Sequence, residues 1–151
     1  MKTDGDFFSI NDFYIANKPK ELNKADYIHA FFSQQGFPKD IEISLLDLIS
    51  PIFEFTDGVL LLKEFHEKNE YNRLIQEKAG KETIQFWSNM IDLTDIFECD
   101  DYLKVKDLAD GLSYVWNKKI EELGYQNIAV AKTYLEEDDE SVYITIAVPS
   151  L

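Results

Sequence analysis

Few residues of this 151-residue chain have the types and spacing that catalysis or metal binding requires. His66 and Glu70 stand four positions apart in a stretch that we expect to be helical, a spacing that can place an imidazole and a carboxylate on one metal ion. The zinc-protease pattern has a second histidine where Glu70 stands. A third ligand would have to come from elsewhere, such as His29 or Asp26. The pair is therefore a weak candidate for a metal site; an exposed polar helix is favoured, and no cofactor is expected.

The nucleophiles of the chain lack neighbours that would activate them. Cys99 lies between Glu98 and Asp100, and negative neighbours disfavour the reactive thiolate. The serines include no Gly-x-Ser-x-Gly motif, and the glycines form no phosphate-binding loop. Paired carboxylates occur throughout so acidic a sequence, so none stands out as catalytic. We therefore expect no catalytic residues and a structural role for Cys99.

The densest charge in the chain is an unbroken run of acids near the C-terminus. These acids are Glu136, Glu137, Asp138, Asp139 and Glu140. The run lies between two segments of strand character, so the sequence predicts that it forms a hairpin tip. One interpretation is a solvated loop that discourages aggregation through strand edges. The other is a carboxylate cluster that enters a basic groove of a partner in place of phosphates. Glu98, Asp100 and Asp101 would extend this candidate partner-binding site if their loop lies at the same end.

The segments around these acids have the clearest periodicity in the sequence. Apolar residues recur at helical spacing at Leu108, Leu112, Val115, Trp116, Ile120 and Leu123. Gly124 follows at the position where a helix C-cap favours glycine. The period then changes to two over 128–135, and a second run rich in β-branched residues covers 142–148. This pattern predicts a C-terminal β-hairpin packed on the last helix.

The rest of the chain predicts helices joined by one further hairpin. Helices are expected over 25–35, 38–49, 63–79 and 82–97, the last with an apolar arc wide enough for a central helix. Asp57-Gly58, between apolar runs, predicts a hairpin over 52–62. The aromatic cluster at 7–15 is ambiguous: it could hold a short helix capped by Ser9 or Asn11, or an edge strand.

Together these elements indicate the α+β class in one domain spanning residues 1–151, with 1–6 flexible. The expected layout has about five helices, a central β-hairpin, and a C-terminal β-hairpin packed on the last helix. The pattern leaves open whether the two hairpins share one sheet.

The charge balance excludes some classes of partner. There are 29 acids against 15 bases, and the net charge is −14. Such a field repels phosphate backbones and anionic lipids, and Arg73 is the only arginine available for bidentate phosphate recognition. We expect no binding to nucleic acid or membrane. Residues 1–6 do not start a secretory signal, and a lone cysteine fits a reducing compartment, which predicts a cytoplasmic protein.

The hypothesis that fits this profile is a small acidic protein that neutralises a basic protein partner. Small size, one domain, strong acidity and the absence of catalytic motifs resemble the bacterial immunity proteins that protect a cell from nuclease-type toxins. The resemblance implies a protein that is not an enzyme. Two alternatives stay open: an enzyme whose site assembles from dispersed carboxylates, with or without a metal, and a regulatory or structural subunit.

Overall fold

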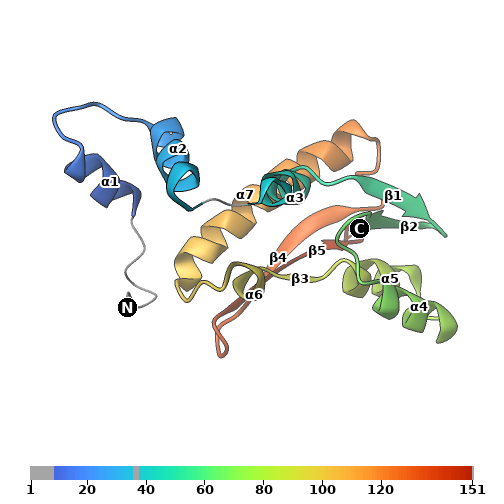
Figure 1. Cartoon of the computed structure of the whole chain (residues 1–151). Helices are drawn as coiled ribbons and strands as arrows, with labels where there is room; N and C mark the ends of the chain where they lie inside the picture. The colour runs from blue at the N-terminus through green and yellow to red at the C-terminus, as the bar shows by residue number, and fades with distance from the viewer. Residues whose placement is uncertain (1–8, 36–37, 151) are drawn as a thin grey trace. The chain divides into compact units, whose positions relative to one another are not determined.

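The computed structural model describes residues 9–35 and 38–150 and divides the chain into two compact units, residues 1–42 and 43–151 (Figure 1). The boundary falls inside helix α3 (Lys39–Ile49). Whether the units form one domain depends on whether each folds alone, so the single domain stays a prediction. Residues 1–6, predicted to be flexible, lie outside the described residues.

The first unit contains helices α1 (Ile10–Ala16) and α2 (Lys24–Gln35). The Ser9 hydroxyl accepts a hydrogen bond from the Asp12 amide at 3.1 Å, which confirms the helix interpretation of this segment and its predicted cap. Phe13 is buried, and its ring lies 5.5 Å from the ring of Tyr27 on α2. Contact between these aromatic rings therefore joins the two helices.

The second unit combines helices with two separate antiparallel sheets. A hairpin of β1 (Phe53–Thr56) and β2 (Val59–Leu62) is followed by α4 (Lys68–Gln76) and α5 (Lys81–Ser88). Then come β3 (Ile91–Asp92), α6 (Leu93–Phe97), α7 (Tyr102–Glu122), β4 (Val130–Glu136) and β5 (Ser141–Ala147). The second sheet has the order β3-β5-β4. The α+β prediction is confirmed, with seven helices in the described residues against the five expected.

The main core forms where α7 lies on the three-stranded sheet. Trp116 has no exposed surface, and Leu112 and Ile120 are buried beside it. The Trp116 indole Nε1 donates a hydrogen bond of 2.8 Å to the carbonyl of Leu48 at the end of α3. The predicted packing of the last helix on the C-terminal hairpin is therefore confirmed. The stripe is buried only at its centre, because Leu123 at its end remains 50% exposed.

Two buried side-chain amides, Gln85 on α5 and Asn89 at its C-cap, cover the outer edge of β2. Gln85 Oε1 accepts from the Leu60 amide at 2.8 Å, and Asn89 Oδ1 accepts from the Leu62 amide at 2.9 Å. The Gln85 amide nitrogen donates to the carbonyls of Ile128 and Ala147, at 2.9 and 3.1 Å. Side chains rather than a strand thus pair with the edge of β2, so the two hairpins do not share a sheet.

The helix predicted over 63–79 begins later, at Lys68. The Leu62 carbonyl accepts from the amides of Phe65 and His66, and this tight turn occupies the start of the predicted helix. The helix also ends before Gly80, the predicted stop. Lys78 takes the left-handed conformation, with φ of 56°, and Gly80 instead caps the start of α5.

The prediction of one central helix over 82–97 is wrong. The segment divides into α5, the short strand β3 and the helix α6. Asn89 ends α5 and uses its side chain on β2, while Asp92 accepts from the Asp95 amide at 3.1 Å and caps α6. The apolar arc therefore comes from three elements that face different neighbours.

Candidate functional site

The acidic run forms the tip of the β4–β5 hairpin, as predicted. Glu136 pairs with Ser141 in the last register position, and the residues between them turn the chain. Glu140 adopts the left-handed conformation, with φ of 50°. All five side chains are exposed. The hairpin thus carries its negative charge at its solvent-exposed end.

The second acidic segment lies at the same end of this unit. Strand β3 is antiparallel to β5, with Asp92 opposite Tyr143, so β3 runs toward the hairpin tip. Helix α6 follows at once and packs on β5, where the Thr94 hydroxyl accepts from the Val142 amide at 3.4 Å. The loop from Glu98 to Asp101 continues from α6 to the start of α7 (Figure 1). The structure therefore places both predicted acidic segments toward the same end of the sheet.

Some of these acids also have local structural roles. Asp101 caps α7 by accepting from the Lys104 amide at 3.3 Å, and its carboxylate lies 3.9 Å from the Lys104 ammonium. Asp92, which sequence analysis did not include, caps α6 at the same end. Among described residues, no cation is within ion-pair distance of Glu98, Asp100 or the hairpin tip. We name these three parts of the surface, Glu98, Asp100 and Glu136 to Glu140, the acidic end.

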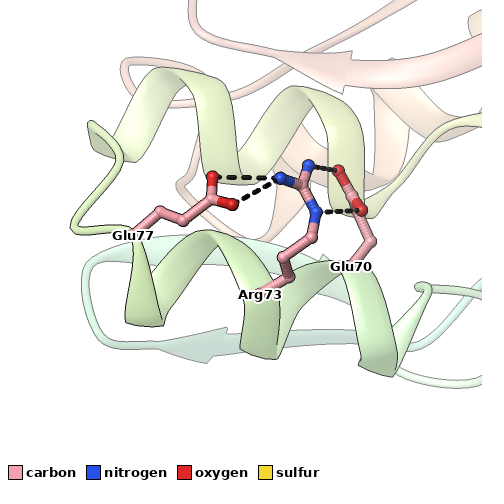
Figure 2. Close-up of polar contacts among 3 residues, drawn as sticks. All are labelled: Glu70, Arg73 and Glu77. Atoms are coloured by element: carbon pink, nitrogen blue, oxygen red, sulfur yellow. Dashed lines mark hydrogen bonds and ion pairs between the residues drawn. The ribbon is translucent and has the colours of Figure 1, made fainter.

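The weak metal candidates, His66 and Glu70, are not brought together in a site. His66 precedes α4, and its Nδ1 is 2.7 Å from the Leu62 carbonyl. Both carboxylate oxygens of Glu70 accept from Arg73, which also contacts Glu77 (Figure 2). The Arg73 guanidinium lowers the pKa of Glu70, and the two carboxylates raise the pKa of Arg73. Within residues 9–35 and 38–150, no group of three or more His, Cys, Asp or Glu could hold a metal ion.

Cys99 is half-buried and packs against the main core. Its Sγ lies 3.8 Å from the Asp101 carbonyl, to which it donates a weak hydrogen bond. These contacts agree with the predicted structural role of the thiol.

An aromatic surface on the other face of the sheet was missed from sequence. Phe86 lies with its ring 5.1 Å from that of Trp87 and 5.3 Å from that of Tyr134. Trp87 is 51% exposed and Tyr134 is 37% exposed. A shallow cavity of about 270 Å³ adjoins them, lined by Glu82, Thr83, Phe86, Trp87, Ala147 and Val148. Trp87 belongs to the segment predicted to form a central helix, but in α5 its side chain lies at the surface.

Comparison with known protein families, curated proteins and solved structures found no match to this chain. Among the helices in the described part of the chain, none has the length and apolar character needed to cross a bilayer.

Proposed function

We propose that this protein binds and neutralises a basic protein partner, and that it is an immunity protein against a nuclease-type bacterial toxin. A nuclease binds phosphates in a basic groove, and a dense group of carboxylates can occupy such a groove in their place. The protein would then act by occlusion and need no catalytic residues of its own.

The observation that carries this proposal is the convergence of two acidic segments at one end of the second unit. The hairpin tip and the loop before α7 are separated in sequence, but β3 and α6 bring the loop to the tip end of the sheet. Apart from Asp101, whose carboxylate lies 3.9 Å from the Lys104 ammonium, these acids have no cation within ion-pair distance among the described residues. An unpaired group of like charges produces a strong local field, which accelerates association with a partner of opposite charge.

The exposed side chain of Tyr134, beside the acidic end, supports the same proposal, and the aromatic surface continues from it through Phe86 to Trp87. Tyr134 stands two residues before Glu136 on β4, so the two side chains share a face of the sheet. Tyrosine and tryptophan are enriched among the residues that dominate binding energy at protein interfaces. We expect the acids to set the association rate, and Tyr134 and Trp87 to slow dissociation.

The proposal includes a cytoplasmic location, where a nuclease toxin would find its substrate. The lone cysteine agrees with a reducing compartment.

The test begins with recovery of the partner from the native host by affinity capture with the full chain. Association rates are then measured over a salt series for wild type and for the triple variant Glu137→Gln, Asp138→Asn and Asp139→Asn. The variant should associate more slowly and with a weaker salt dependence, because steering follows the local field. Its folding free energy should change by no more than about 0.5 kcal/mol, as is usual for exposed substitutions.

A matched control removes three charges from the opposite end of the unit. Glu54, Glu121 and Glu122 are exposed, and the last two lie at the C-terminal end of α7. Replacing them with glutamine changes the net charge of −14 by the same three charges, but it should leave the association rate close to wild type. If the two triple variants slowed association equally, total charge and not the acidic end would steer binding. Recovery of no basic partner would contradict the proposed function itself.

A further inference from the structure

Strand β4 is an edge strand whose outer side is covered at one position only, among the described residues of the second unit. Asn117 on α7 accepts from the Ala131 amide at 2.7 Å and donates to the Ala131 carbonyl at 3.1 Å. The Ser113 hydroxyl donates to the same carbonyl at 3.1 Å. Ala131 therefore directs both of its backbone groups away from β5.

The alternating hydrogen-bond pattern of an antiparallel strand pair then determines the side to which the backbone groups of the following residues point. Residues two apart direct their amide and carbonyl groups to the same side, so Thr133 and Leu135 face outward like Ala131. Strand β5 shows the matching alternation. Val142, which is opposite Leu135, directs its amide to Thr94 on the β3 side and not to β4. Within the described part of the second unit, no group bonds to the outward backbone of Thr133 or Leu135. We call this stretch, residues 133–135, the open edge.

The open edge differs from the other strand edges of the second unit. The edge of β2 is covered by Gln85 and Asn89, as exposed edges in proteins usually are. Among the described residues, the outer edge of β1 also has no hydrogen-bond partner, but that strand has four residues and leads into the Asp57-Gly58 turn. The open edge of β4 instead leads directly into the five acids of the hairpin tip. The two uncovered edges therefore differ in the density of negative charge beside them.

We infer that the open edge binds an extended, basic segment of the partner as an added strand of the sheet. Backbone hydrogen bonds to Thr133 and Leu135 would hold the segment, as in other cases of strand addition. Its lysine or arginine side chains would lie beside Glu136 and the tip. This inference rests on the proposed function and specifies how the partner is held.

A second copy of this chain is a poor occupant of the same edge. It would bring another strand with the same acidic tip, on a molecule whose net charge is also −14. Like charges brought together at an interface weaken association. The charge of the open edge therefore favours a basic partner over self-association.

The direct test uses a synthetic peptide of alternating lysine and valine as the probe. Backbone amide spectra and hydrogen exchange are recorded for the full chain with and without this peptide at low salt. We expect the amides of Thr133 and Leu135 to become protected, because they would donate to the added strand. The same peptide N-methylated along its backbone keeps its charge and should give no protection.

A proline substitution tests the edge in the protein itself. Leu135→Pro removes an amide proton that faces solvent, and edge strands accept proline at such positions. It should weaken peptide binding by roughly 3- to 10-fold, the effect of losing one hydrogen bond. Phe55→Pro on the uncovered edge of β1 is the matched control and should not change peptide binding.

The outcomes separate this inference from the proposed function. Protection of Thr133 and Leu135, lost with the N-methylated peptide, supports strand addition even if Leu135→Pro fails to fold. Chemical-shift changes confined to Glu136–Glu140, equal for both peptides, would overturn strand addition while leaving the acidic end as the binding surface. No binding of either peptide would also overturn it, and capture of a basic partner would then still support the proposed function.

Discussion

The buried amide of Gln85 offers the sharpest test of how the second unit is held together. Its side chain joins three segments, since it accepts from Leu60 on β2 and donates to Ile128, in the turn before β4, and to Ala147 at the end of β5. Gln85→Leu keeps a similar volume but removes all three hydrogen bonds. The substitution therefore isolates the polar contribution from the packing contribution.

The expected loss follows from the groups that the variant leaves unpaired. The Leu60 amide and the Ile128 carbonyl would lose the hydrogen bonds described for them, whereas Ala147 keeps its place in the ladder with Val130. A buried polar group without a partner costs about 1–3 kcal/mol, so the two groups together should lower the free energy of unfolding of Gln85→Leu by about 2–6 kcal/mol. Such a loss is a large share of the roughly 5–15 kcal/mol that stabilises most domains.

Urea unfolding followed by circular dichroism measures this loss, and hydrogen exchange reports on the Leu60 amide directly. The control is Gln76→Leu on α4, the same chemical change at an exposed position. The control should alter the free energy of unfolding by less than about 0.5 kcal/mol. If Gln85→Leu changes stability no more than Gln76→Leu, the reasoning about the buried amide is refuted.

Three further predictions concern the core, the pH dependence and the choice of partner. Trp116→Ala should lower the free energy of unfolding by about 3–5 kcal/mol, and an unchanged melting temperature would contradict the burial of this side chain. Burial, and then the hydrogen bond to Asp57, raise the pKa of Tyr71 from 10.0 to about 12. The folded state therefore holds this proton more tightly, so stability should fall as the pH rises from about 10 to about 12, and Tyr71→Phe should remove that part of the fall. The chain should not bind generic DNA or RNA; saturable micromolar binding in a low-salt polarisation titration would show that the charge argument is wrong.

Sequence predicted the elements that have a long period or a specific turn. The α7 stripe around Trp116 and the two strands after it repeat over enough residues to identify both elements. Asp57-Gly58 forms the expected hairpin turn, with φ of 51° and 82°, and Gly124 takes the expected positive φ of 83°. At these positions the local conformational preference and the tertiary structure agree.

Sequence failed where side chains rather than periodicity decide the structure. Strand β3 has two residues, too few to show a period, and it forms because β5 offers an edge to Ile91. The roles of Gln85 and Asn89 depend on distant partners, which no local pattern indicates. The hairpin tip was predicted, but the position of Glu98 toward the same end of the sheet depends on β3 and could not be predicted. The binding role of these acids stays a prediction.

The contrast between the two tryptophans gives the protein two independent optical reporters. Trp116 is fully buried with its indole hydrogen-bonded to Leu48, so its emission should shift to longer wavelength only when the core opens. Trp87 is 51% exposed and belongs to the aromatic surface that includes Tyr134 on the edge strand. A partner seated there should alter the emission and quenching of Trp87 while leaving Trp116 unchanged. Fluorescence of Trp87→Phe and Trp116→Phe would thus separate binding from unfolding without an attached dye.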